Sequence, residues 1–192
     1  MQYRVIKHAF NRTFVADVEK IAATFPMEPG AVLEKTEYST RDCELRWIRH
    51  GSPGYALLEK IFFGVLAHEK LLDPKLCVLE DLQHTVYGPG AFHDWHVDSY
   101  KRSYNQFDSR GDKRFIGRKR KVSMSVLLND ASEFEGGAFE ISMFPNGRNT
   151  VGTALTEFSE AGDLAIFDSN LCHRVAPVTG GVRRSLVAWI CA

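Results

Sequence analysis

The chain has 192 residues, a length that fits one domain, 1–192, with a substantial buried core. Hydrophobic residues make up 44% and charged residues 25%, which is typical of a globular protein and excludes extended disorder. The 24 Lys and Arg residues balance the 24 Asp and Glu residues, so no overall field attracts nucleic acid or a membrane surface.

The N-terminal segment does not have the pattern of a targeting signal. Residues 1–14 carry charges where a secretory signal has an uninterrupted apolar core, and no run reaches transmembrane length. We therefore expect an intracellular, cytoplasmic protein that has no membrane partner. The four cysteines form no Cys-x-x-Cys pair, so we expect free thiols at Cys43, Cys77, Cys172 and Cys191.

Residues 1–75 are expected to form a mainly helical support. Residues 11–25 place apolar side chains at intervals of three and four, and Asn11 or Thr13 can cap the start of this helix. A second apolar stripe in residues 54–72 predicts another helix. The segment between the two helices can hold a short hairpin or strands.

From about residue 76 the pattern changes from helical to strand-like. Short segments are separated by glycine, proline and acidic turns, at intervals suited to an all-β barrel or sandwich. Within residues 120–128, apolar and polar or smaller side chains alternate, as in a half-buried strand; the apolar ones are Val122, Met124, Val126 and Leu128. We predict an α+β protein in which a helical support packs on a jelly-roll core over 76–192.

A basic segment, Ser99 to Lys121, separates two predicted strands and is too long and polar for a tight hairpin loop. Nine of its residues are Lys or Arg and two are Asp. Loops of this length are often lids or binding loops, and a solvated loop is an equally good interpretation.

The stretch "FHDWHVDSY", residues 92–100, gathers imidazoles and carboxylates. On a regular strand His96 and Asp98 project to the same face, with Cα atoms roughly 6.6 Å apart, which suits two ligands of one metal. Asp94 shares that face in this interpretation, while His93 and Trp95 point the other way. His-x-Asp by itself is a weak signal.

A third ligand is available from a distant strand. His173 in "NLCHRVAPV" follows the apolar segment "GDLAIF" and a short turn. Two imidazoles and one carboxylate form the facial triad that leaves three positions open on non-haem iron(II). Zinc bound by the same residues and a hydrogen-bonded core histidine at 173 remain alternatives at this point.

Arg183 and Ser185 are candidates for binding an anion in the same cavity. Arg183 lies ten residues after His173, and Ser185 shares its strand face. A guanidinium with a nearby hydroxyl is a receptor for a carboxylate. Because Arg184 must face the opposite way, we expect one arginine of the pair to lie inside.

From Tyr87 to Ala192 the chain resembles the iron(II) and 2-oxoglutarate-dependent dioxygenases, in particular the prolyl 4-hydroxylase-like branch that includes bacterial PKHD-type hydroxylases. The matching segments are "YGPGAFHDWHVD", "RKVSMSVLLNDASEFEGGAFEI", "GDLAIFDSNLCHRVAPV" and "GVRRSLVAWI", which cover a little over half of the chain in the family's order. The resemblance implies a double-stranded β-helix.

The resemblance also implies the site and its cofactors. The implied iron(II) ligands are His96, Asp98 and His173. Arg183, helped by Ser185, is expected to bind the distal carboxylate of 2-oxoglutarate, and Tyr87 to line the co-substrate pocket. Members of the family couple O2 and the conversion of 2-oxoglutarate to succinate and carbon dioxide with hydroxylation of an unactivated C–H bond, with ascorbate as a reductant. One departure is His93, which replaces a tyrosine common in prolyl hydroxylases.

Three hypotheses follow. The first is a hydroxylase of prolyl residues in a peptide or protein, with the basic segment Ser99 to Lys121 as a lid. The second is a hydroxylase of a free amino acid or another small metabolite. The third is a non-catalytic cupin-like jelly roll that binds a metal or 2-oxoglutarate. Nucleic acid is a minor interpretation, because Trp189 stands where the dealkylase branch has an arginine. The sequence does not specify the oligomeric state.

Overall fold

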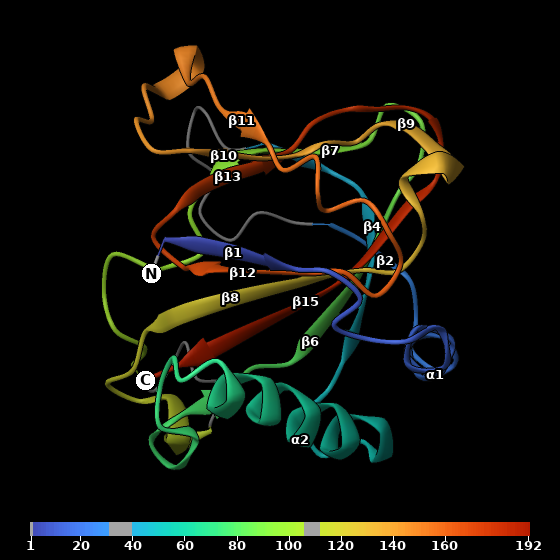
Figure 1. The fold of residues 1–192 in the computed structure, drawn as a ribbon. Coiled ribbons are helices and arrows are strands. Elements are labelled where there is room, and N and C mark those ends of the chain that lie inside the picture. The colour runs from blue at the N-terminus through green and yellow to red at the C-terminus, as the bar shows by residue number, and fades with distance from the viewer. Residues whose placement is uncertain (1, 31–39, 106–111) are drawn as a thin grey trace.

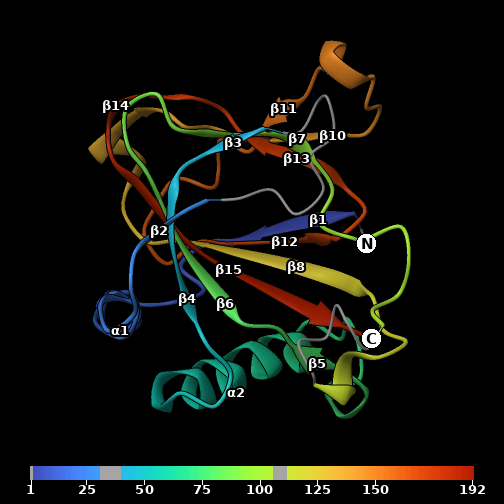
Figure 2. The ribbon, with the colours of Figure 1, turned by 180° about the vertical axis from the view of Figure 1, so that it is seen from behind.

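The computed structural model describes residues 2–30, 40–105 and 112–192. Two antiparallel sheets face each other, and two helices cover the outer side of the larger sheet (Figures 1 and 2). The larger sheet has the order β1 (Tyr3–Ile6), β12 (Leu164–Asp168), β8 (Arg120–Leu127), β15 (Arg183–Cys191), β6 (Leu82–Tyr87), β4 (Glu44–Ile48) and β2 (Glu28–Pro29), with β5 (Val78–Leu79) paired to β15. The smaller sheet has the order β11 (Thr153–Ala154), β10 (Phe139–Ser142), β13 (Cys172–Val175), β7 (Phe92–His96) and β3 (Arg41–Asp42).

A third, two-stranded antiparallel sheet is formed by β9 (Phe134–Gly136) and β14 (Val178–Gly181). Single turns of 3-10 helix occur at Pro74–Leu76, Lys113–Phe115, Ala131–Glu133 and Gly147–Asn149. Because the two sheets exchange strands along the chain and enclose a common interior, the architecture is the predicted double-stranded β-helix of the α+β class.

The two helices confirm the sequence prediction and refine their ends. In α1 (Arg12–Ala23) the Asn11 side chain accepts a hydrogen bond from the Phe14 backbone, so Asn11 is the cap. Helix α2 (Pro53–His68) ends before the predicted residue 72, because Lys70 adopts a left-handed conformation and the Leu71 amide donates back to the Leu66 carbonyl. No helix within the described ranges is both long and apolar enough to cross a membrane.

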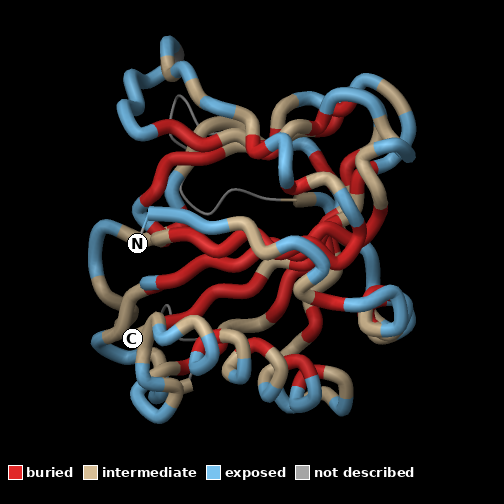
Figure 3. Tube along the Cα trace, viewed as in Figure 1, coloured by how far each residue is buried: buried red, intermediate tan, exposed pale blue. Residues whose placement is uncertain are grey.

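The central strands of the larger sheet, β12, β8, β15 and β6, are largely buried on both faces (Figure 3). The outer face of this sheet packs on the helices through residues such as Met124 and Val126, whereas Leu127 and Phe167 face the interior between the sheets. The expected half-buried strand at β8 is therefore wrong in one respect: the polar alternating residues, Ser123 among them, are buried in that interior and do not face solvent. A second layer covers this strand on each side, which periodicity alone does not reveal.

The N-terminal third contributes more than a helical support. Strands β1, β2 and β4 extend the larger sheet, and β3 pairs with β7 at the edge of the smaller sheet. The change of period near residue 76 therefore does not separate helices from strands. These four strands are short, with two to five residues each, so they leave little alternating pattern in the sequence.

Candidate active site

The two strands that carry the candidate histidines are neighbours in the smaller sheet. Strand β13 pairs with β7 so that His173 lies directly opposite His96, and Asp98 follows just beyond the end of β7. One donor atom from each of the three side chains lies within 4.8 Å of the other two. The topology therefore brings together the three residues that the sequence predicted as a metal site.

The donor atoms are oriented for a common ligand. Nδ1 of His96 lies 2.7 Å from the Asp94 carbonyl oxygen, and Nδ1 of His173 lies 2.9 Å from the Leu171 carbonyl oxygen. Carbonyls only accept, so each Nδ1 carries the proton and each Nε2 keeps its lone pair. These Nε2 atoms lie 3.7 and 3.6 Å from the two carboxylate oxygens of Asp98.

The Asp98 carboxylate is the group that most needs a metal. Its Oδ2 atom is buried and accepts no hydrogen bond from the described residues. Burial by itself raises the pKa of Asp98, but His173 and His96 together bring it below its usual value. An ionised, buried oxygen without a donor is costly, and a divalent cation satisfies it. The residues present thus fit a metal ion.

Burial keeps the neighbouring imidazoles neutral. Burial and the adjacent His173 lower the pKa of His96 to about 3, and burial with the adjacent His96 holds the pKa of His93 well below its usual value. Neutral imidazole is the form that binds metals, so proton release does not oppose ligation at neutral pH. Phe167 and Phe139 pack on the His173 ring, with centroids 4.6 and 5.5 Å away, and limit its rotation.

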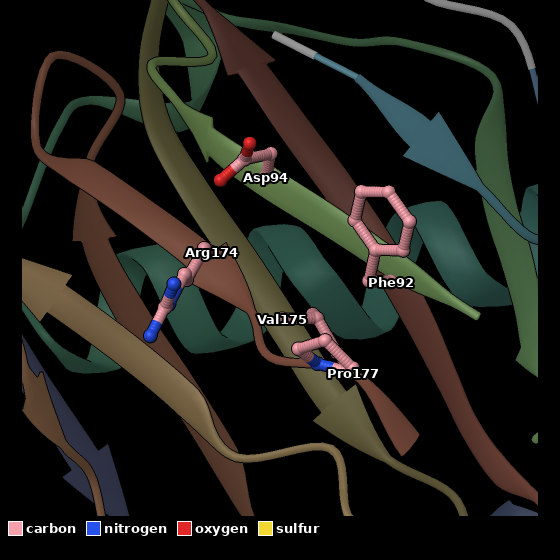
Figure 4. Close-up of a pocket in the computed structure, with 5 residues that line it drawn as sticks. All are labelled: Phe92, Asp94, Arg174, Val175 and Pro177. Atoms are coloured by element: carbon pink, nitrogen blue, oxygen red, sulfur yellow. The ribbon is translucent and has the colours of Figure 1, made fainter. Parts of the chain in front are cut away.

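The predicted alternation along β7 is wrong. His93 stacks on His96, with ring centroids 3.6 Å apart, so it faces the interior. Asp94 lines a pocket on the outer side with Arg174 (Figure 4), and the Arg174 guanidinium lies 4.7 Å from the Trp95 ring. An irregularity in the pairing with β13 inserts one extra residue between His93 and His96. Asp94 supports the site through its backbone carbonyl.

Arg183 lines the same pocket as the triad. It is 1% exposed, and its Nη1 donates to the Ser185 hydroxyl at 3.3 Å. The Tyr87 ring centroid lies 5.6 Å from its guanidinium carbon. Burial lowers the pKa of Arg183, since no described carboxylate compensates its charge. Arg184 points the opposite way, to Glu19 at 3.2 Å, which confirms that one arginine of the pair is inside.

A glycine turn closes over Arg183. Gly137 has a φ of +61°, and a Cβ there would lie 3.1 Å from Cδ of Arg183 and 2.9 Å from the Val178 side chain. Only glycine combines this backbone conformation with so close an approach. The "EGG" turn therefore has a role in shaping the pocket that the sequence analysis did not assign.

The pocket has further lining residues that the sequence analysis missed. Arg41 from β3 and Gln83 from β6 line it together with the metal triad, Tyr87, Arg183 and Ser185. Arg41 belongs to a two-residue strand without any motif, so no local signal marks it. Gln83 gives a weak signal, as a polar residue at the alternating positions of a strand that ends in Tyr87.

The described parts of the basic segment Ser99 to Lys121 pack beside the larger sheet. The Tyr104 and Arg118 backbones pair with each other, and Arg120 is buried against Glu80. Within residues 99–105 and 112–121, none lines the pocket. Residues 106–111 lie outside the described residues, so the lid stays a prediction.

The sequence model of the 2OG-Fe(II) oxygenase superfamily matches residues 82–191, which contain the triad, Tyr87, Arg183 and Ser185. The chain belongs to this superfamily. Iron(II), 2-oxoglutarate and O2 are the cofactor and co-substrates that the superfamily implies, and the donor set described above fits the metal.

Curated members of the superfamily match in part. A PKHD-type hydroxylase of Xylella fastidiosa (strain M23) is 39% identical over 69 residues, which cover 36% of this chain and 27% of the relative. Another, from Aliarcobacter butzleri, is 37% identical over 84 residues, which cover 44% of this chain and 33% of the relative. The matched segments therefore span a third or less of these relatives.

Solved structures support the fold over the whole chain. The viral collagen prolyl hydroxylase of Paramecium Bursaria Chlorella virus-1, in its 2OG complex, gives a TM-score of 0.64 at 18% identity, covering 100% of this chain and 97% of the other. A Pseudomonas putida prolyl-4-hydroxylase gives a TM-score of 0.59 at 21% identity, covering 98% and 91%. At these identities the likeness establishes the double-stranded β-helix of the superfamily.

Proposed function

We propose that this protein is an iron(II)- and 2-oxoglutarate-dependent dioxygenase that hydroxylates an unactivated C–H bond. The proposed metal ligands are His96, Asp98 and His173. Arg183 and Ser185 are proposed to bind the distal carboxylate of 2-oxoglutarate, with Tyr87 as a wall of that subsite. Ascorbate is the reductant proposed to keep the metal ferrous.

One observation carries the proposal. A buried triad with an unsatisfied Asp98 oxygen lies in the same pocket as Arg183, a buried guanidinium that no described carboxylate neutralises. The first group requires a cation and the second requires an anion. A dicarboxylate with one end at the metal and the other at Arg183 satisfies both groups.

The chain's own residues orient and shield the reactants. Bound iron and 2-oxoglutarate supply the oxidative chemistry of this superfamily. The backbone carbonyls of Asp94 and Leu171 hold the two imidazoles with Nε2 inward, and Phe139 and Phe167 exclude water around His173. Arg183 fixes the distal end of the co-substrate, because a guanidinium holds a carboxylate through two parallel hydrogen bonds.

A prolyl residue in a peptide or protein is the proposed substrate. Support comes from the PKHD-type hydroxylases and from a Trichoplax adhaerens prolyl hydroxylase solved with a peptide fragment, which has a TM-score of 0.66 at 14% identity and covers 98% of this chain. The retained Asp98 favours hydroxylation over halogenation, because it occupies the position that a halide would take on the metal.

The test begins without oxygen. Iron(II) and then 2-oxoglutarate are added to metal-free protein while the visible metal-to-ligand charge-transfer band is recorded. Oxygen is then admitted and succinate is followed. We expect a band that decays as succinate forms, with stoichiometric release of carbon dioxide. Proline-containing peptides are then screened for acceleration of succinate formation and a mass gain of one oxygen atom.

The variant Asp98→Ala serves as the metal-site control, and Arg12→Gln, an exposed change on α1, as the matched surface control. Iron binding without a charge-transfer band in the wild-type protein would exclude chelation by 2-oxoglutarate and favour the structural-metal alternative. A band with no succinate after oxygen is admitted would contradict the dioxygenase assignment.

A further inference from the structure

A second guanidinium lies in the pocket besides Arg183. Arg41 is half-buried on β3, opposite His93 of β7, and lines the same cavity as the metal triad. Its Nε donates to the Cys43 sulfur at 2.9 Å and its Nη2 to the Gln83 side-chain oxygen at 2.6 Å. Two neutral acceptors therefore orient Arg41, and the described residues place no carboxylate in an ion pair with it.

The partners of Arg41 hold it against the pocket wall. Gln83 is 3% exposed and Cys43 is 6% exposed, so both acceptors are fixed by packing. Arg41 also lies beside Tyr87: burial raises the pKa of the Tyr87 phenol, and the charge of Arg41 and a hydrogen bond between the two side chains oppose that rise. A guanidinium has five N–H donors, and the bonds to these neutral partners leave donors of Arg41 available to a ligand.

The charges in the pocket do not balance. Its described lining carries two guanidinium groups, Arg41 and Arg183, and a single carboxylate, Asp98. The histidines count as neutral, because an imidazole must be neutral to ligate a metal. A divalent cation and dianionic 2-oxoglutarate cancel each other. One positive charge is left over, and an excess charge in a desolvated site favours an anionic ligand.

We propose that Arg41 is a specificity residue that binds a carboxylate of the substrate, so that the preferred substrate carries this group close to the carbon that is hydroxylated. This inference rests on the proposed function and narrows its substrate class. The carboxylate has two possible sources, the α-carboxylate of a free amino acid and an acidic side chain next to the prolyl residue of a peptide.

Arg41 is assigned to the substrate because both ends of 2-oxoglutarate already have partners in the pocket. One end of the co-substrate is taken by the metal and the other is matched by Arg183, which is fully buried beside Ser185. Arg41 stands on a different strand, across from His93, where the wall of the pocket reaches the sheet edge at β3.

The test compares carboxylate probes with their neutral amides. L-Proline is paired with L-prolinamide, and acetylated, amidated alanyl-prolyl-glutamate with its alanyl-prolyl-glutamine counterpart. Binding is measured by anaerobic calorimetry on protein loaded with iron(II) and 2-oxoglutarate, and succinate formation in air is a second readout. For one pair we expect the carboxylate to bind at least about tenfold more tightly than the amide, and that pair identifies the source.

Arg41→Gln should remove this preference, so that the affinity ratio within the pair falls to about one. Arg41→Lys keeps the positive charge but loses the planar guanidinium that can donate two parallel hydrogen bonds. This variant should retain part of the preference for the carboxylate. Arg12→Gln is the matched control, because it removes an exposed guanidinium that pairs with Asp130. This variant should keep the wild-type ratio of carboxylate to amide affinity.

Two results would overturn the inference while the proposed function stands. One is a wild-type protein that forms succinate but binds neither carboxylate better than its amide. The other is an unchanged ratio in Arg41→Gln with an increased requirement for 2-oxoglutarate, which would move Arg41 to the co-substrate subsite. Absence of any succinate from the wild-type protein would instead count against the proposed function.

Discussion

Two buried arginines begin adjacent strands of the larger sheet and differ in what neutralises them. Arg120 on β8 makes a bidentate ion pair with Glu80, at 2.8 and 2.7 Å, and its guanidinium lies 4.0 Å from the Trp189 ring. Arg183 on β15 has one hydrogen bond, to Ser185. Burial lowers the pKa of both arginines. Glu80 nevertheless raises the pKa of Arg120 well above its usual value, whereas the pKa of Arg183 stays lowered.

This contrast separates a group that stabilises the fold from a group that is proposed to bind a ligand. The Arg120 cluster is complete, with Tyr104 and Cys191 donating further hydrogen bonds to Glu80. The pocket that contains Arg183 and Asp98 leaves both charges without a full set of partners, and binding sites commonly sacrifice stability in this way. Variants that change one of the two arginines or its surroundings at a time test this contrast.

The largest effect is expected at the metal ligands. His96→Ala and Asp98→Ala each remove one of three anchors, so iron binding and turnover should both be lost, by more than about 100-fold. Iron content after dialysis and succinate formation measure the two losses. Retained activity in either variant would exclude this triad as the metal site.

A large loss of stability is expected from Arg120→Gln, with a smaller effect on the metal site, because Arg120 Nη1 also donates to the Asp98 carbonyl oxygen at 3.4 Å. This change leaves Glu80 buried beside a neutral partner, which typically costs about 3–5 kcal/mol. Urea denaturation of the metal-free protein measures the free energy of unfolding. An unaltered denaturation midpoint would mean that the ion pair between Arg120 and Glu80 does not stabilise the fold.

The same cluster predicts a dependence on pH. Burial raises the pKa of Glu80, but Arg120 lowers it further, so the net pKa lies below the usual value. The stability that ionised Glu80 adds is present above the unfolded pKa of about 4.3 and is lost as the pH falls through the lower folded pKa. The stability difference between wild type and Glu80→Gln should therefore narrow below about pH 4. A difference that widens in acid would contradict the assigned sign.

Arg183→Gln should behave in the opposite way to Arg120→Gln. Because Arg183 has no charged partner in the described residues, its loss should leave the free energy of unfolding nearly unchanged or increase it. The requirement for 2-oxoglutarate should rise at least about tenfold at normal iron content. Arg184→Gln, on the outer face, is the matched control and should keep the wild-type requirement; equal shifts in both variants would refute the subsite.

The smallest effect is expected from His93→Ala. His93 stacks on His96 but contributes no ligand atom to the triad, so we expect a loss of iron affinity of about tenfold or less. Titration of metal-free protein with iron(II) measures it. A loss equal to that of His96→Ala would make His93 a ligand.

The sequence by itself indicated the residues that are proposed to perform the chemistry. Spacing and residue type made His96, Asp98 and His173 a candidate metal site, because side chains two apart on a strand share a face. The resemblance to the dioxygenases favoured Arg183 over Arg184. The two helices and the jelly-roll class follow from hydrophobic period in the same way. These features depend on local geometry, which the order of residues specifies directly.

Tertiary structure decided the features that depend on partners distant in the chain. The extra residue in β7 turned His93 inward and Asp94 outward, and only the pairing with β13 reveals it. Burial of Ser123 required a second layer on each side of β8, and Arg41 entered the pocket because β3 pairs with β7. Strand pairing and packing, which no local pattern encodes, determined which polar groups became buried and which charge was left over in the pocket.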